Sequence, residues 1–294
     1  MVRIYLILLT GILVVSLGSI IIRWTGDVPA GIIAFYRVFI STMLLGLYTW
    51  KRTGKIENSV FRKPHWHYFL AGFLLAVHFI CWIASLQLTT IASSIFLVST
   101  HPIFAVIFSV FILREYPQRR TFPAFLIAML GMYLIVFQDS GPGMNNITGD
   151  LLALLSAVSF AAYLLIARLH REQTDFFGYL VIVYGTAALA CAIFDIITGN
   201  PFTGFTGVSW IMMVLLALGP HLSGHTILNW CSRKIPVYKV NLGLLLEPVI
   251  ATAGGVMLFD EYPLPLFFAG AGCILSALIL LLWMEENRDQ KIST

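Results

Sequence analysis

Ten apolar runs follow one another along the 294-residue chain, separated by short stretches of glycine, proline, polar and charged residues. Each run has roughly the 20 residues that an α-helix needs to cross the hydrocarbon core of a bilayer. A helix also satisfies its backbone hydrogen bonds internally, as a segment in lipid must. The sequence therefore predicts an all-α integral membrane protein with ten transmembrane helices. The runs are 3–22, 31–50, 66–86, 91–113, 121–138, 150–169, 176–197, 209–231, 239–259 and 264–284.

The composition excludes several classes of protein. Hydrophobic residues make up 59% of the chain and charged residues only 11%, whereas a water-soluble domain has about a quarter of its residues charged. Ten crossings of roughly 20 residues leave about 90 residues for loops, so no separate soluble catalytic domain fits. The net charge of +4 comes from short basic clusters, unlike the continuous basic face of a nucleic-acid-binding protein. The four cysteines have no metal-type spacing, and we expect no disulfide framework.

The distribution of basic residues predicts the orientation. If the N-terminus is cytoplasmic, all of the 18 lysines and arginines except Arg23 and Arg37 fall on the cytoplasmic side, whereas acidic residues occur on both sides. Lysine and arginine concentrate in cytoplasmic loops, and acidic residues follow no such rule. The sequence therefore predicts a protein of the cytoplasmic (inner) membrane with both termini in the cytoplasm, as an even number of crossings requires.

The chain contains an internal repeat. A shift of 146 residues aligns 101–117 with 247–263, and six of the 17 positions are identical. We expect a duplicated five-helix unit, residues 1–145 and 146–294. Because five is odd, the second copy enters the membrane from the opposite side, as in many secondary transporters with inverted repeats. The identical pairs are Pro102/Pro248, Ala105/Ala251, Val110/Val256, Glu115/Glu261, Tyr116/Tyr262 and Pro117/Pro263.

The motifs resemble those of a known family. An arginine follows two aromatic residues in the second run (Phe35-Tyr36-Arg37), and a proline lies 13 residues before a glutamate in the fourth and ninth runs. These features are similar to those of the drug/metabolite transporter superfamily, and within it of EamA-type transporters, over essentially the whole chain. The resemblance implies a basket of helices 1–4 and 6–9 around a central cavity, with helices 5 and 10 peripheral. It also implies export of small metabolites, often amino acids or related compounds, without a cofactor.

Ionisable side chains inside the apolar runs indicate where function resides. A charge in hydrocarbon is costly and usually faces a cavity or a partner. Of the six candidates, all but Arg37 and His225 lie near the middle of the membrane. We expect them to serve substrate binding or coupling. The candidates are Arg37, His78, His101, His221, His225 and Glu247.

Glu247 and His101 form the leading hypothesis. The 146-residue shift places them at equivalent positions, which near a pseudo-two-fold axis can face each other across one cavity. Gly243, Ala251 and Gly254 share the face of Glu247 and permit close approach of a helix or a substrate. We hypothesise that Glu247 binds a substrate ammonium group or a proton, and that His101 partners Glu247 or a substrate carboxylate. The alternative is structural, with the glutamate hydrogen-bonded to a neighbouring helix and the histidine satisfied in the core.

Arg37 has two interpretations. Its planar guanidinium suits bidentate binding of a substrate carboxylate. Alternatively, the side chain extends outward to the membrane surface or holds a structural ion pair, since it lies only about 10 Å from the outer end of its run at the helical rise.

His221 and His225 are one helical turn apart, so both imidazoles share a face and suit a divalent metal. No third ligand is evident except Glu247, so we expect the pair to line a polar cavity or to contribute to proton coupling. An intramembrane metal-dependent enzyme that uses all three side chains is the rival hypothesis from another class.

Aromatic side chains are candidates for padding a substrate cavity. Trp82 and Trp230 lie near the ends of runs, where membrane-interface anchoring is the alternative. Asn229 and Asn241 flank a basic connection, and we expect them to be loop or cap residues. Glu115 and Glu261 are expected at the starts of the following helices, where a carboxylate suits the helix dipole. The aromatic candidates are Tyr36, Trp82, Tyr163, Tyr184 and Trp230.

Together these features favour a secondary transporter of a small polar metabolite in the lipid bilayer. We expect it to be an exporter that works by alternating access. Protons are the candidate coupling ion. We expect no resident metal, no cofactor and no enzymatic activity. A nucleotide-driven pump is disfavoured because the chain has no Gly-rich phosphate-binding lysine motif. A channel or receptor is disfavoured because two mirrored halves suit a two-sided switch.

Overall fold

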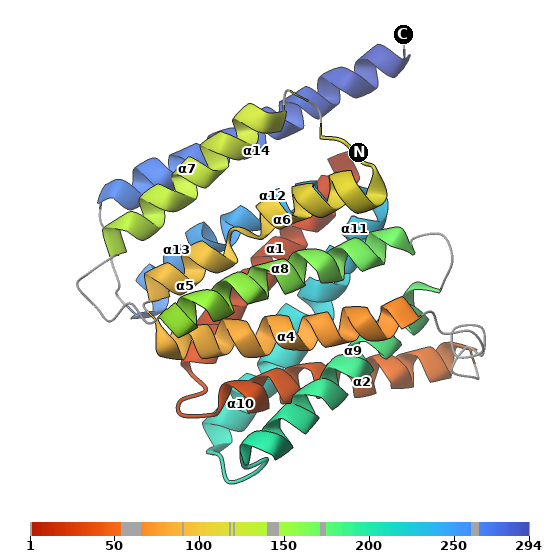
Figure 1. Ribbon diagram of the computed structural model, residues 1–294, viewed down its shortest axis with the longest axis vertical. Helices are drawn as coiled ribbons and strands as arrows, with labels where there is room; N and C mark the ends of the chain where they lie inside the picture. Colours follow the sequence, from red (N-terminus) through yellow and green to blue (C-terminus); the bar gives the residue numbers. More distant parts are fainter. Residues whose placement is uncertain are drawn as a thin grey trace.

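The computed structural model describes residues 2–53, 66–89, 91–117, 119, 121–139, 147–170, 175–259 and 265–293. Within these ranges every regular element is a helix (Figure 1), which confirms the all-α prediction. The elements are α1 (Val2–Arg23), α2 (Ala30–Thr53), α4 (Trp66–Leu88), α5 (Ile91–Val98), α6 (His101–Phe108), η1 (Ser109–Leu113), α7 (Thr121–Asp139), α8 (Ile147–Leu169), α9 (Phe176–Thr198), α10 (Gly207–Leu216), η2 (Ala217–His225), α11 (Thr226–Lys234), α12 (Val237–Gly243), η3 (Leu244–Leu246), α13 (Glu247–Phe259) and α14 (Pro265–Ser293).

Each predicted apolar run coincides with one helix or with consecutive helical pieces. Among the described residues, seven segments are long and apolar enough to cross a membrane, which supports an integral membrane protein. Three shorter apolar helices complete the set: His101–Leu113, Thr121–Leu134 and Pro265–Leu280. The count of ten crossings and the inversion of the repeat stay predictions.

The run 91–113 was expected to form one continuous helix, but it is interrupted. Helix α5 ends at Val98, and α6 begins at His101 with Pro102 as its second residue. Proline has no backbone N–H and fits the first turn of a helix but not its interior, so Pro102 favours a new start here. The repeat has a matching irregularity, because the short 3₁₀ turn η3 leads into α13, which begins with Glu247 and Pro248.

The segment after η1 also differs from expectation. Glu115 was expected at the start of the next helix, but α7 begins only at Thr121. The π-helical turn η1 ends at Leu113 and is followed by Arg114, whose φ of 56° is left-handed. The backbone N–H of Glu115 donates a hydrogen bond to the Ser109 carbonyl oxygen at 2.9 Å, which closes the turn. Glu261, its repeat equivalent, lies outside the described residues.

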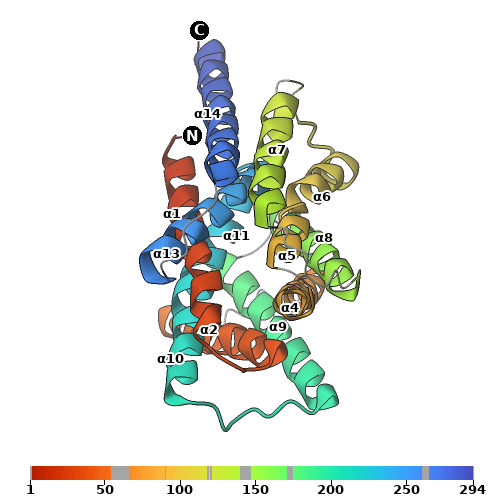
Figure 2. The same cartoon turned by 90° about the vertical axis from the view of Figure 1, so that its left-hand side faces the viewer.

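The helices form a central group and a peripheral pair. Helix α4 packs against α8 and α9, α2 packs against α9, and α1 packs against η2 and α13. Helices α7 and α14 pack mainly against each other at the outside of the body (Figures 1 and 2). The resemblance implied this peripheral place for the fifth and tenth helices.

Glycines permit the closest helix contacts. A Cβ atom at Gly243 would lie 3.1 Å from Ile12 Cδ1 of α1, and one at Gly254 would overlap Ile20 of the same helix. The small-residue face expected beside Glu247 therefore accommodates α1, whereas Ala251 of the same face lines a cavity. Close packing against α1 fixes the position of α13 and hence of Glu247.

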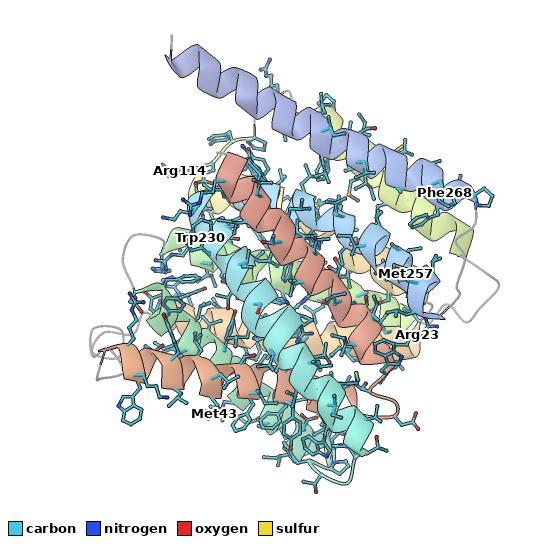
Figure 3. The ribbon with its side chains drawn as sticks, turned by 180° about the vertical axis from the view of Figure 1, so that it is seen from behind. Arg23, Met43, Arg114, Trp230, Met257 and Phe268 are labelled. Atoms are coloured by element: carbon cyan, nitrogen blue, oxygen red, sulfur yellow. The ribbon has the colours of Figure 1, made fainter. Side chains whose placement is uncertain are left out.

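The outer surface is apolar, as contact with lipid requires. Met257, Phe268 and Met43 are 83%, 65% and 54% exposed, and Figure 3 shows them pointing away from the body. Polar and ionisable side chains of the membrane-spanning segments are instead concentrated inside, where Arg37, His221 and Asn229 are almost completely buried.

Candidate functional site

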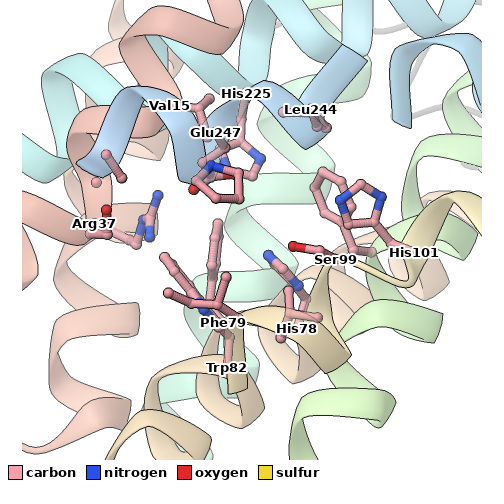
Figure 4. A pocket seen from close by; sticks show the side chains of 17 residues that line it. Val15, Arg37, His78, Phe79, Trp82, Ser99, His101, His225, Leu244 and Glu247 are labelled. Atoms are coloured by element: carbon pink, nitrogen blue, oxygen red, sulfur yellow. The ribbon is translucent and has the colours of Figure 1, made fainter. Parts of the chain in front are cut away.

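A partly open cavity lies between the two helix interruptions and helices α1, α2, α4, α8 and α13 (Figure 4). The space that the centre of a water molecule can reach inside it is about 70 Å³. Several water molecules or a small solute fit in such a space, since one water needs about 10–15 Å³ by this measure. The wall is mostly apolar, with a few ionisable groups, which is typical of a small-molecule site.

The structure brings six of the eleven candidate residues to this cavity. The other five lie outside its lining: Tyr36, Tyr163, Tyr184, His221 and Trp230. The six that line it come from α2, α4, α6, η2 and α13, segments far apart in the sequence. They are Arg37, His78, Trp82, His101, His225 and Glu247.

Arg37 reaches the cavity from α2 and is only 1% exposed. Its Nε and Nη1 atoms have no hydrogen-bond partner among the described residues. The guanidinium carbon lies 3.9 Å from the centre of the Phe79 ring, a cation–π contact that holds the group in place. Arg37 therefore does not extend outward to the membrane surface, the alternative that its position near the end of the run suggested.

Glu247 reaches the same space from the first residue of α13. It forms no hydrogen bond or ion pair with any described residue, so the predicted structural alternative of a bond to a neighbouring helix is absent from the described part of the chain. The N-terminus of α13 stabilises a negative charge at this position. Figure 4 shows Glu247 and Arg37 facing the same space from two different helices.

The two histidines of the first half differ in their surroundings. His101 is 5% exposed, begins α6, and has no partner at Nδ1 among the described residues. His78 is tied to α8, because its Nδ1 lies 2.8 Å from Ser156 Oγ, which also donates to the His78 carbonyl oxygen at 3.0 Å. His101 has a side-chain hydrogen bond with Asn241 of α12, whereas His78 holds α4 against α8.

The histidines of η2 occupy two depths. His225 lines the cavity, and His221 lies behind it with its ring 5.2 Å from that of His225 and 4.3 Å from that of Tyr184. Among the described residues no group of three His, Cys, Asp or Glu side chains is close enough to hold a metal ion. The metal-enzyme alternative, which needs Glu247 together with both histidines, is therefore not favoured.

Two of the predicted tyrosines outside the lining, Tyr36 and Tyr163, have other partners. The Tyr36 hydroxyl donates to the Phe202 carbonyl at 2.7 Å, and its ring packs on Trp210, so Tyr36 connects α2 to α10 and to the segment before α10. Tyr163 accepts a hydrogen bond from Asn229 Nδ2. Asn229 was expected in a loop or cap, but it is fully buried within α11, and so is Asn241 within α12.

Several cavity residues were not predicted. Phe79 and Phe160 form much of the apolar wall, and Ser19 and Ser99 contribute small polar side chains. The only sequence signal was at Ser99, which with Thr100 precedes His101 and Pro102 and so marks the helix interruption. Trp82 also lines the cavity, although its place near the end of a run favoured the membrane interface.

Comparisons with known proteins agree with this architecture. The profile of the EamA-like transporter family matches residues 2–137 and again residues 147–283. The uncharacterized transporter YcxC of Bacillus subtilis (strain 168) is 24% identical over 191 residues, which span 60% of this chain and 60% of that protein. A crystal structure of another protein superimposes with a TM-score of 0.81, covering 95% of this chain and 96% of the other at 20% identity. At that identity the likeness concerns the fold alone.

Proposed function

The chain belongs to the EamA-like transporter family, and from that premise we propose that it is a secondary active transporter that exports small polar metabolites, amino acids or related compounds, with protons as the coupling ion. Membership of the family and the apolar helices identify a membrane transporter. The substrate class, the direction and the coupling are the proposal.

One observation carries the substrate class. Arg37 and Glu247 are groups of opposite charge that face one cavity and attract each other, but neither forms a hydrogen bond or a close ion pair with the other or with any other described residue. Arg37 is 1% exposed and two of its nitrogen atoms have no hydrogen-bond partner among the described residues, which is unfavourable for a buried charge. The site therefore gains when a ligand forms hydrogen bonds with both Arg37 and Glu247. A zwitterion does so, with its ammonium group at Glu247 and its carboxylate on the guanidinium fork of Arg37.

The rest of the wall fits a small substrate. Phe79, Phe160 and Trp82 provide apolar surface for a side chain, and Gly18 and Ala251 leave room. His101 and Ser99 offer neutral hydrogen-bonding groups at the interruption between α5 and α6. We propose that these groups orient the substrate through hydrogen bonds and do not bind its charged groups.

Glu247 is also the proposed coupling group. A carboxylate that binds either a proton or a substrate ammonium couples the two by competition, because both need its negative charge. His225 lies on the same cavity and provides a second proton acceptor. Protons moving inward would then exchange for substrate moving outward.

Alternating access is proposed to result from movement of residues 1–145 against residues 146–294. The two family matches, 2–137 and 147–283, support a division near this point. The cavity draws its lining from both halves, so relative movement of the halves changes its access. The charge distribution of the loops supports a protein of the inner membrane with both termini in the cytoplasm.

Uptake into proteoliposomes tests the proposal. A panel of labelled amino acids, organic cations and organic acids is offered with and without an imposed pH gradient. We expect saturable uptake of zwitterions, accelerated by the gradient and competed by other zwitterions. Equal uptake of organic cations lacking a carboxylate would contradict the role of Arg37, and uptake insensitive to the gradient would contradict proton coupling.

A further inference from the structure

An ion pair outside the cavity joins the two halves of the chain. Arg168 donates from both Nε and Nη2 to Glu115 Oε1, at 2.9 and 2.7 Å. Arg168 is 9% exposed and Glu115 is 25% exposed, so the pair is largely shielded from solvent. Hydrogen bonds between two charged groups are about twice as strong as neutral ones. The pair is therefore a firm tie between the segment after η1 and helix α8.

The same arginine reaches a third element. Arg168 Nη1 donates to the Arg233 carbonyl oxygen near the end of α11, at 3.2 Å. Arg233 Nη2 in turn donates to the His170 carbonyl oxygen just after α8, also at 3.2 Å. One guanidinium thus holds together the ends of η1, α8 and α11.

All three elements lead back to the cavity. Helix α6, which continues into η1, contributes His101; α8 contributes Phe160; and η2, which continues into α11, contributes His225. Arg168 and Arg233 follow Phe160 and His225 by eight residues each, or about 12 Å at the helical rise. The three cavity walls therefore converge at one end of the molecule, where the ion pair joins them.

The halves meet at this pair. Glu115 belongs to the first family match, 2–137, and Arg168 and Arg233 belong to the second, 147–283. We propose that Glu115 and Arg168 form a latch that closes the cavity at this end and that breaks each time transport opens it. This inference rests on the proposed function only in that it assumes movement between the halves.

The backbone next to the latch supports this assignment. Arg114, immediately before Glu115, has φ 56°, a left-handed conformation that is unfavourable for a residue with a Cβ atom. That turn ends η1 and brings the Glu115 carboxylate to α8. Residues held in such conformations cluster at switch regions, which fits a latch that is made and broken better than a permanent tie.

A labelling experiment that needs no substrate tests the latch. Ser99 lines the cavity and is 8% exposed. In a chain whose four native cysteines are replaced by alanine, Ser99→Cys reports access to the cavity through its rate of reaction with a membrane-impermeant methanethiosulfonate reagent. The latch side is identified as the face from which an Arg119→Cys chain is labelled, since Arg119 is exposed and lies four residues after Glu115.

With the latch intact we expect slow labelling of Ser99→Cys from the latch side. Glu115→Gln and Arg168→Gln should each raise that rate at least tenfold, and the exchange Glu115→Arg with Arg168→Glu should lower it again. Arg119→Gln, a change of charge at the same end outside the pair, should leave the rate unchanged. Glu115→Asp and Arg168→Lys keep both charges and should raise the rate two- to fivefold, which provides the readout if the glutamine variants do not fold.

The outcomes separate the latch from the proposed function. Unchanged labelling in all four single variants, with a lowered melting temperature, would show a purely structural tie and overturn the latch, whatever the transport assays give. Faster labelling reversed by the charge exchange would support the latch even in a protein that carries no member of the substrate panel, in which case the proposed function fails alone.

Discussion

Glu247 lies on the cavity wall and forms no hydrogen bond or close ion pair with any described residue. We predict that Glu247→Gln, which keeps the size of the side chain and removes its charge, reduces transport at least tenfold without lowering membrane expression. A tenfold loss corresponds to about 1.4 kcal/mol in the transition state, well within what a lost charge-assisted bond provides. Initial rates in proteoliposomes at matched protein content measure the effect.

Asp27→Asn is the matched control for this change. Asp27 is an exposed carboxylate between α1 and α2, away from the cavity, so the same chemical change there should leave the rate at the wild-type value. A wild-type rate in Glu247→Gln would assign that glutamate to structure and remove the main support for proton coupling.

At Arg37, an effect on transport can be measured separately from an effect on stability. Its Nε and Nη1 atoms are buried without partners, and an unsatisfied buried polar group costs about 1–3 kcal/mol. We predict that Arg37→Met, an unbranched apolar replacement, raises the melting temperature of the detergent-solubilised protein by a few degrees while it abolishes transport. Thermal unfolding without substrate measures the first effect, and proteoliposome uptake the second. A lower melting temperature would mean that Arg37 serves mainly to stabilise the fold.

Residue identity and depth predicted part of the cavity, and side-chain direction could not be predicted. Arg37, His101 and Glu247 stood out because ionisable groups in apolar runs are rare and costly. Phe79 did not, since an aromatic residue among many apolar ones carries no signal until its neighbours are known. His221 was expected beside His225 at the site, but the structure places it one layer behind, next to Tyr184.

At the scale of elements, the contact between α7 and α14 depends on a missing side chain. A Cβ atom at Gly131 would lie 2.5 Å from the Gly270 carbonyl oxygen and 2.8 Å from Cys273 Cβ. Both distances are shorter than van der Waals contact, so we predict that Gly131→Ala forces the two helices apart and lowers the melting temperature by several degrees. The KM for transport should stay unchanged, because neither helix lines the cavity.

Gly272→Ala on α14 is the control for this prediction. A Cβ atom there meets no atom within 4 Å, and alanine favours a helix over glycine by up to about 1 kcal/mol. Its melting temperature should therefore equal or slightly exceed that of the wild type. A Gly131→Ala protein as stable as Gly272→Ala would show that the α7–α14 contact is loose enough to absorb a methyl group.

Helix positions could be predicted from hydropathy, whereas the irregularities within helices could not. Length and apolar composition fix where a segment enters lipid, and the predicted runs coincide with the observed helices. The interruption before His101 could have been predicted from Pro102, since proline starts a helix more readily than it continues one. The π-helical stretch η2 has Pro220 inside it and depends on packing against α1 and α2, which no local pattern reports.

For the whole molecule, the repeat predicts where the chain divides, and it gives no indication of how the halves join. The 146-residue shift divides the sequence close to where the two family matches meet. It did not indicate that Glu115 pairs with Arg168, because the repeat compares equivalent positions, and these two are not equivalent. Contacts between halves depend on their docking, which emerges only in three dimensions.

The inversion of the repeat is itself testable at this scale. Lys51 at the end of α2 and Thr203 before α10 are both exposed and lie in corresponding parts of the two halves, after the second helix of each. Five predicted crossings separate them, so they must lie on opposite faces of the membrane. With the N-terminus in the cytoplasm, Lys51 is cytoplasmic and Thr203 is external.

We therefore predict that, in chains without native cysteines, Thr203→Cys reacts with a membrane-impermeant maleimide in intact cells, and Lys51→Cys reacts only in inside-out vesicles. Labelling of both from the same face would contradict the inverted repeat, because an even number of crossings would then separate the halves' equivalent loops. Opposite faces with the sides exchanged would keep the inversion and reverse the orientation, so the latch at Glu115 and Arg168 would close the external rather than the cytoplasmic end.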